Sequence, residues 1–284
     1  MMTVGEARRL GRVNLEGSVQ NSALDADILL GHVLEWPRSR LIAEDREALS
    51  PESRAQFLKL LERRAAGEPV AYLTGKKQWF GMVLDVDRSV LVPRPETELL
   101  AEAAIDVCYS VEAHLCVDVG TGSGAVAIAI AGALPGLRMI GIDISREALA
   151  VAQRNAVRIL GEGRVELLPG DLLATLKVEP DVVVANLPYI TSDERSELGQ
   201  DVLSEPAEAL FAGPTGLEPY RRLFAQMVAR QWRPEVLLEV DPRRAEGVAS
   251  VATDAFPDAG LEIIPDLAGK DRIIRMSTLH HRPL

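Results

Sequence analysis

The sequence predicts an α/β protein in which a mostly parallel sheet carries the functional site and a small all-helical domain precedes it. Three observations support this fold class. From residue 115 onward, short apolar runs alternate with helical patterns. A glycine-rich turn separates the first of these runs from the helix after it. Residues 3–67, by contrast, are helical in pattern throughout.

The helical segment is expected to form a domain of its own, residues 1–75. Residues 22–34 place apolar side chains at helical spacing, and Trp36-Pro37 ends that helix. Another helix begins at Ser50-Pro51, a capping residue followed by a first-turn proline. Two interpretations of this domain stay open: it stabilises the catalytic domain as a cap, or it recognises the substrate.

Residues 76–92 are expected to form a β-hairpin that links the two domains. Strand-like segments run from Gln78 to Val86 and from Ser89 to Val92, so Asp87-Arg88 is predicted to be the turn between them. The catalytic domain is then expected to occupy residues 93–284.

The first strand of the sheet runs into a glycine loop that is typical of nucleotide-binding proteins. Gly120, Gly122 and Gly124 follow the apolar run 115–119 and precede an alanine- and isoleucine-rich helix. Without a Cβ, they let the backbone turn sharply and let a ligand approach the main chain. Free N–H groups at the start of the helix face that ligand. The spacing fits a dinucleotide as well as S-adenosylmethionine, so the loop leaves the cofactor open.

Acidic residues end the strands around this loop. Asp118 precedes the loop, where a carboxylate favours the ammonium group of S-adenosylmethionine. Asp143 ends the next strand and is placed to accept both ribose hydroxyls of either cofactor. Asp171 is expected to bond the adenine amine, with Leu172 against the ring. The carboxyl ends of parallel strands meet at one edge, so these residues are expected to share one site.

The residues that end a later strand, 182–185, indicate the type of reaction. Asn186-Leu187-Pro188-Tyr189 is close to the N-P-P-Y signature of methyltransferases that modify a planar nitrogen. An amide nitrogen is a poor nucleophile, so its N–H groups need acceptors that leave the lone pair facing the methyl group. The Asn186 side-chain oxygen and the carbonyl of Leu187 can be those acceptors, and Tyr189 can stack on the planar group. The tetrapeptide also resembles ribosomal-RNA adenine dimethylases, so it leaves the substrate open.

The remaining elements alternate until the end of the chain. The last two strands have no helix between them, so one of them is expected to run antiparallel. Strands are expected at 115–119, 138–142, 164–168, 182–185, 235–240, 261–265 and 272–276, with helices that include 145–160, capped by Ser145, and 217–231.

The composition and charge of the chain limit the kinds of partner, location and metal that can be expected. The chain of 284 residues is 47% hydrophobic, and its formal net charge of −11 counts against a nucleic-acid substrate. It contains no apolar run long enough for a membrane span and no signal-peptide core, so a cytoplasmic location is expected. Cys108 and Cys116 predict no disulfide framework. The histidines lack ligand spacing, His280-His281 being interpreted as tail, so no metal is expected.

Several segments together resemble the HemK/PrmC family of protein-(glutamine) methyltransferases, which act on peptide chain release factors. The resemblance covers nearly the whole chain from about residue 20, and its most specific part is Arg94-Pro-Glu-Thr-Glu98. The other segments are Gly67–Gly75, Phe80-Gly81, Val90–Pro93, the glycine loop, Asp143, Asn186–Tyr189, Glu205–Gly213, Gly216–Arg221 and Gly269–Arg272. Two departures stand out: Leu187 replaces a proline, and Glu239–Arg244 replaces a segment that usually reads E-I-G-x-x-Q.

The resemblance implies a class I, Rossmann-like fold with a seven-stranded, mostly parallel sheet. It implies methylation of a glutamine side-chain amide, expected in a GGQ motif of release factors, with S-adenosylmethionine as the cofactor. We also expect a monomer in the cytoplasm that binds neither membrane nor nucleic acid. The implied catalytic residues are Asn186, Leu187, Pro188 and Tyr189, which also bind substrate together with Arg94, Glu96, Thr97 and Glu98. The implied cofactor-binding residues are Asp118, Gly120, Thr121, Gly122, Ser123, Gly124, Asp143, Ile144, Asp171, Leu172 and Asn186.

Three hypotheses follow. The first is methylation of a glutamine amide in a protein. The second is methylation of an adenine amine in RNA, which Asn186–Tyr189 supports and the acidic charge opposes. The third is a non-catalytic nucleotide-binding scaffold for the translation machinery.

Overall fold

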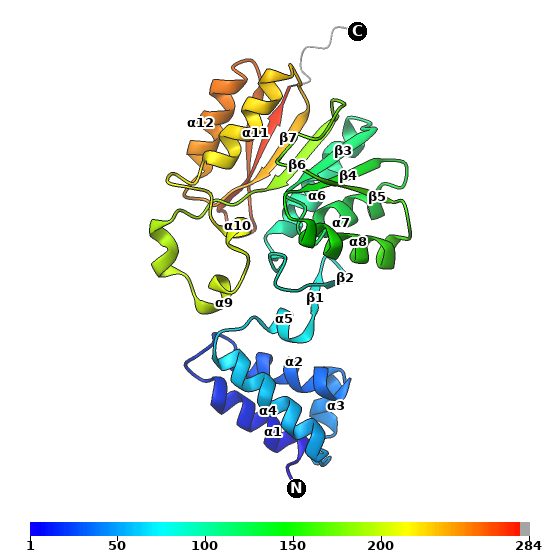
Figure 1. Cartoon of the computed structure of the whole chain (residues 1–284), viewed down its shortest axis with the longest axis vertical. Helices are drawn as coiled ribbons and strands as arrows, with labels where there is room; N and C mark the ends of the chain where they lie inside the picture. The colour runs from blue at the N-terminus through cyan, green and yellow to red at the C-terminus, as the bar shows by residue number, and fades with distance from the viewer. Residues whose placement is uncertain (279–284) are drawn as a thin grey trace. The chain divides into compact units, whose positions relative to one another are not determined.

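The computed structural model describes residues 1–278, and the predicted tail at His280-His281 lies outside the described residues. The chain divides into two compact units. Unit 1 comprises residues 1–76 and 197–204, and unit 2 comprises residues 77–196 together with the chain from 205 onward (Figure 1). Within residues 1–278, no helix combines the length and the apolar character that a membrane crossing requires.

Unit 1 is helical because its apolar residues recur at helical spacing and its helix starts are capped. Thr3 and Glu6 form a capping box at the first helix, and the Ser50 hydroxyl accepts a hydrogen bond from the Ser53 N–H at 3.0 Å. Leu15, Leu29 and Phe57 are fully buried in the core of the unit. The helices are α1 (Val4–Leu15), α2 (Ser22–Leu34), α3 (Arg38–Ala43), α4 (Pro51–Ala65), α5 (Val70–Thr74) and α9 (Gln200–Leu203).

The hairpin forms earlier in the chain than the sequence predicted. Its strands are β1 (Lys76–Trp79) and β2 (Met82–Asp85), and the turn is Phe80-Gly81. Both turn residues have positive φ, 48° and 69°, which suits the twist of a two-residue hairpin. The predicted hairpin turn at Asp87-Arg88 is therefore wrong. Residues 87–90 instead form a separate turn, with the Val90 N–H bonded to the Asp87 carbonyl at 3.2 Å, and the predicted second strand that ends at Val92 does not form.

Unit 2 is built on a seven-stranded sheet. Its strands are β3 (Leu115–Val119), β4 (Arg138–Asp143), β5 (Val165–Pro169), β6 (Val182–Asn186), β7 (Glu235–Glu239), β8 (Gly260–Pro265) and β9 (Asp271–Ser277). The order is β5-β4-β3-β6-β7-β9-β8 (Figure 1). The first five strands are mutually parallel, and β9 runs antiparallel to both β7 and β8. The seven predicted strands are confirmed to within one residue at each end, as is the antiparallel strand near the carboxyl terminus.

Helices cover both faces of this sheet, as the alternation predicted. The helices α6 (Thr97–Ser110), α7 (Ala125–Ala133) and α8 (Arg146–Leu160) pack on one face. The helices α11 (Glu218–Ala229) and α12 (Ala245–Ala255) pack together on the other (Figure 1). The two short helices η1 (Asp193–Glu197) and α10 (Ala207–Leu210) lie in the long connection after β6. Because β3, β6 and β7 are covered on both sides, their residues are buried at nearly every position, and apolar residues stand next to one another in each strand rather than alternating with polar ones.

The strand order creates a switch point next to β3. The chain passes from β3 to β4 on one side and later returns to β6 on the other side. The connections that leave β3 and β6 at their carboxyl ends therefore diverge, which opens a crevice where ligands bind in sheets of this kind.

Candidate active site

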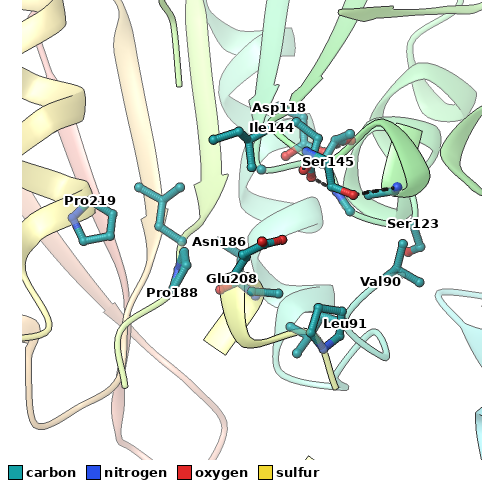
Figure 2. A pocket seen from close by; sticks show the side chains of 18 of the residues that line it. Val90, Leu91, Asp118, Ser123, Ile144, Ser145, Asn186, Pro188, Glu208 and Pro219 are labelled. Carbon is teal, nitrogen blue, oxygen red and sulfur yellow. Dashed lines mark hydrogen bonds between the residues drawn. The ribbon is translucent and has the colours of Figure 1, made fainter. Parts of the chain in front are cut away.

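A cavity of about 580 Å³ lies at the carboxyl ends of the parallel strands, and every residue that lines it belongs to unit 2. Figure 2 shows labelled side chains entering it from β6, from α10 and from the loop that carries Val90 and Leu91. The predicted site residues that line it are Arg94, Thr97, Asp118, Gly120, Thr121, Gly122, Ser123, Asp143, Ile144, Asp171, Leu172, Asn186, Leu187 and Pro188. The predicted residues Glu96, Glu98, Gly124 and Tyr189 are not among the lining residues.

The glycine loop is held against β4. The N–H groups of Gly120 and Thr121 both donate to the Ile142 carbonyl, at 2.8 and 3.0 Å. Gly124 has a φ of 80°, and a Cβ there would meet the Ala152 Cβ at 3.1 Å. Gly124 therefore serves the close packing of α7 on α8, which explains why it does not line the cavity itself.

Asp118 is a buried carboxylate at the start of this loop. Its side chain accepts a hydrogen bond from the Thr121 hydroxyl at 2.7 Å, and only 2% of the residue is exposed. Burial raises the pKa of Asp118 to about 7, although hydrogen bonds from Thr121 and the Ala127 N–H act in the opposite direction. An ammonium group beside this carboxylate would favour its charged form. Asp118 is thus suited to hold a cation.

Asp143 ends β4 and tightens the same loop. Its two carboxylate oxygens accept hydrogen bonds from the Gly122 N–H at 2.8 Å and the Ser145 N–H at 2.9 Å. Burial raises the pKa of Asp143, and these backbone donors partly oppose that shift. Ile144 is 66% exposed although it lines the cavity, so it offers an apolar surface to a ligand.

Asp171 and Leu172 line the same cavity, but the Asp171 carboxylate is already paired with Arg222 of α11. Leu172 is half-buried and has a positive φ of 54°, an uncommon conformation for a leucine. With this backbone conformation, both Asp171 and Leu172 lie at the wall of the cavity. Their assignment to the adenine stays a prediction.

Asn186 is the last residue of β6, and its side-chain N–H donates to the Thr97 hydroxyl at 3.2 Å. Leu187 follows with 3% exposure and packs into the core cluster of the sheet. The ring of Tyr189 packs against that cluster, and burial raises the pKa of its hydroxyl. The stacking role of Tyr189 stays a prediction.

The segment Arg94–Glu98 has structural partners. The Arg94 guanidinium pairs with the buried Glu205 carboxylate at 2.6 Å, and the Arg94 carbonyl accepts from the Trp79 indole at 2.8 Å. The Glu98 carboxylate accepts from the N–H of Phe80, in the hairpin turn, at 2.8 Å. This segment therefore joins the hairpin to the wall of the cavity, and its proposed contact with substrate stays a prediction.

Other lining residues escaped the sequence reasoning. Pro206, Glu208 and Phe211 come from the α10 segment, and Arg222 comes from α11. The segment Glu205–Gly213 is one of those that resemble the family, and this resemblance was the signal that could have indicated a role in the site. No pattern within the segment indicated which of its side chains face a ligand.

The fold and the cavity define a class I S-adenosylmethionine-dependent methyltransferase. The sheet ends in the expected antiparallel strand. Asp118 would repel the pyrophosphate of a dinucleotide, whereas it suits the ammonium group of S-adenosylmethionine. The Gly122 N–H, which would face a pyrophosphate, is occupied by Asp143. The residues present therefore fit S-adenosylmethionine, which is the cofactor of this class.

Comparison with known proteins identifies the family. The PrmC N-terminal domain matches residues 6–75, and the methyltransferase small domain matches residues 97–215. The release factor glutamine methyltransferase of Moorella thermoacetica is 40% identical over 95% of each chain. That of Deinococcus radiodurans is 37% identical over 90% of this chain and 91% of the relative. This chain belongs to the release factor glutamine methyltransferase family.

A solved structure shares the fold. The catalytic domain of hMettl16, solved in complex with a hairpin of the MAT2A 3'UTR, aligns with a TM-score of 0.56. The match covers 77% of this chain and 82% of that one at 13% identity, so the likeness concerns the fold alone.

Proposed function

We propose that this protein methylates the side-chain amide nitrogen of a glutamine in peptide chain release factors. The observation that carries the proposal is the position of Asn186. Its side chain lines the same cavity as the glycine loop and Asp143, at the end of the neighbouring strand β6. Relatives that match over 90% or more of this chain are named for the same reaction.

S-adenosylmethionine bound in this cavity would supply an electrophilic methyl group, and its sulfur would keep the electron pair of the carbon–sulfur bond. The amide nitrogen of the substrate would form the new bond with its own lone pair and release one proton to solvent. That lone pair is delocalised into the carbonyl, so the protein must orient it. The Asn186 oxygen and the Leu187 carbonyl are assigned to accept hydrogen bonds from the two amide N–H groups. These hydrogen bonds strengthen as positive charge develops on the nitrogen.

The other lining residues have supporting roles in this proposal. Asp118 holds the ammonium group of the cofactor, and Asp143 holds its ribose. Pro188 keeps Leu187 extended, so that the carbonyl of Leu187 is available to the substrate. The Arg94–Glu205 pair holds the α10 wall of the cavity, because a charge-assisted bond to a carboxylate with 2% side-chain exposure is costly to break.

Unit 1 is proposed to recognise the release factor, because a single glutamine offers too few contacts for selectivity. Val13 and Ile42 in this unit are 64% and 55% exposed, and apolar side chains of this kind suit a protein partner. We further propose that the protein acts as a monomer in the cytoplasm without binding nucleic acid. The net charge of −11 supports the last point.

The test is incubation with methyl-labelled S-adenosylmethionine and either a release factor or ribosomal RNA. Label is expected in the release factor, at one glutamine that mass spectrometry can locate. A release factor whose glutamine is replaced by asparagine is the matched control and should stay unlabelled. Label in the RNA alone would overturn the proposal, and label in neither would favour a non-catalytic scaffold.

A further inference from the structure

The direction in which Asn186 points its amide group decides whether it can accept a hydrogen bond from a substrate amide. The two ends of an asparagine side chain have almost the same shape, so packing alone does not distinguish them. The carbonyl end accepts, and the amino end only donates. Some neighbouring group must therefore set the orientation.

Two buried residues beside Asn186 form a hydrogen-bonded chain with it. Thr97, the first residue of α6, accepts from the Asn186 amino group at 3.2 Å. The Thr97 side chain also lowers the pKa of Glu239, which is the effect of a hydroxyl that donates towards the carboxylate. Glu239 ends β7 and is the register partner of Asn186 on the adjacent parallel strand. Thr97 thus connects two strand ends at the edge of the cavity.

The number of hydrogens on each group sets the direction of the hydrogen bonds between Asn186, Thr97 and Glu239. A threonine hydroxyl has one hydrogen and two lone pairs, and an ionised carboxylate can only accept. When Glu239 is ionised, which its pKa of about 7 allows above neutral pH, the Thr97 hydroxyl therefore donates its hydrogen towards Glu239 and can only accept from Asn186. The amino end of Asn186 must then face Thr97, which leaves the carbonyl oxygen of Asn186 for the cavity.

Glu239 is a buried acid, and the charges of Arg272 and Arg94 favour its ionised form. It is 3% exposed, and its backbone carbonyl accepts from the Tyr220 hydroxyl at 3.0 Å. Within residues 1–278, its Oε2 atom has no hydrogen-bond partner. A buried carboxylate oxygen without a partner is destabilising, and a neutral side chain of similar size would avoid that cost. Burial also raises the pKa of Glu239 to about 7, so the site tolerates the charge poorly.

We propose that Glu239 is a positioning residue which, through the Thr97 hydroxyl, orients the Asn186 amide so that its oxygen faces the substrate. This inference rests on the proposed function of Asn186 and adds a role for Glu239 and Thr97. Neither residue needs to touch the substrate. Their effect is to remove the alternative orientation, in which Asn186 would present donors to an amide that itself donates.

The experiment compares Thr97→Val, Thr97→Ser, Glu239→Leu and the Thr97→Val/Glu239→Leu double variant in the full chain. Valine matches threonine in shape and lacks the hydroxyl, whereas serine keeps it. Turnover and KM for release factor are measured with saturating S-adenosylmethionine about one pH unit above the Glu239 pKa of about 7, where this carboxyl is mostly ionised, and cofactor affinity is measured by calorimetry. The hydrogen exchange of the Asn186 side-chain amide is followed by NMR without substrate or cofactor. Thermal unfolding by circular dichroism is the folding control.

Thr97→Val and Glu239→Leu are each expected to lower turnover by about 10- to 100-fold, as loss of an orienting partner typically does. The double variant should lose no more than either single variant, because both break the same chain. Thr97→Ser keeps the hydroxyl and should therefore recover most of the turnover that Thr97→Val loses. Cofactor affinity should change by less than about twofold, and the Asn186 amide hydrogens should exchange faster only in the variants that lack the chain.

Parent-like turnover of Thr97→Val, or losses that multiply in the double variant, would overturn the inference. If Glu239→Leu does not fold, the comparison of Thr97→Val with Thr97→Ser decides by itself. The NMR measurement separates this inference from the proposed function. An enzyme that methylates no release factor would refute the function, whereas unchanged exchange of the Asn186 amide in Thr97→Val would refute the inference alone.

Discussion

Asp118 should make cofactor binding depend on pH near neutrality. Its carboxylate is almost fully buried, and burial raises its pKa to about 7 in the cofactor-free protein. An ammonium group binds the ionised carboxylate and not the neutral acid. Binding must therefore drive a proton off Asp118 at lower pH, and the cost of that step falls as the pH rises towards 7.

The size of the effect follows from the ionised fraction. With a pKa of about 7, the ionised fraction rises roughly tenfold between pH 5 and 6 and about fivefold between pH 6 and 7. The affinity for S-adenosylmethionine should rise by the same factors. In the cofactor-free protein, the contribution of Asp118 to the free energy of unfolding changes with pH in the opposite direction. Between the ordinary pKa of an aspartate and 7, folded Asp118 keeps a proton that the unfolded chain has lost, so its contribution to stability declines as the pH rises.

Calorimetry in buffers of different ionisation enthalpy would measure both the affinity and the protons released. Asp118→Asn is the matched control, because it keeps an oxygen for the Thr121 hydroxyl but cannot ionise. The variant should bind more weakly and lose most of the pH dependence between 5 and 7. A parent protein whose affinity is flat over this range would refute the assignment of the ammonium group to Asp118.

Four further substitutions test other parts of the site. Asn186→Ala should lower turnover by two to three powers of ten while cofactor affinity barely changes, because one positioning acceptor is worth about 3–4 kcal/mol in comparable sites; single-turnover rates would show this, and full activity would contradict the assignment. Asp143→Ala should weaken cofactor binding by about 1–3 kcal/mol through loss of charge-assisted hydrogen bonds, and unchanged calorimetry would exclude the ribose role. Leu187→Ala should reduce the free energy of unfolding by about 2–5 kcal/mol in urea titrations, because the side chain is 3% exposed; a loss below about 0.5 kcal/mol would show that the site is not packed. Ile42→Glu should raise the KM for release factor and leave the melting temperature within a few degrees, since the side chain is 55% exposed; an unchanged KM would remove Ile42 from the docking surface.

The strands and the glycine loop could be predicted because their signals are local. A short apolar run bounded by glycine, proline or acid indicates a strand from neighbouring residues alone, and the seven runs of the sheet follow this pattern. Positive φ at Gly120, Gly122 and Gly124 follows from the absence of a Cβ. The positions of Asp118 and Asn186 at one edge followed from the rule that parallel strands end together. The sequence therefore determined the sheet and the strand-end residues of the cavity, and the family resemblance implied the cofactor.

Only the tertiary structure decided which side chains meet across long chain separations. The hairpin turn at Phe80 requires positive φ in an aromatic residue, which propensity disfavours and which the Glu98 carboxylate helps to hold through its hydrogen bond to the Phe80 N–H. The Arg94–Glu205 pair joins residues that are 111 positions apart. Thr97 lies between Asn186 and Glu239 because α6 packs against β6 and β7. The spacing of apolar residues in the sequence indicates which face of a helix or strand is buried. The pairings described above depend instead on how these elements pack against one another.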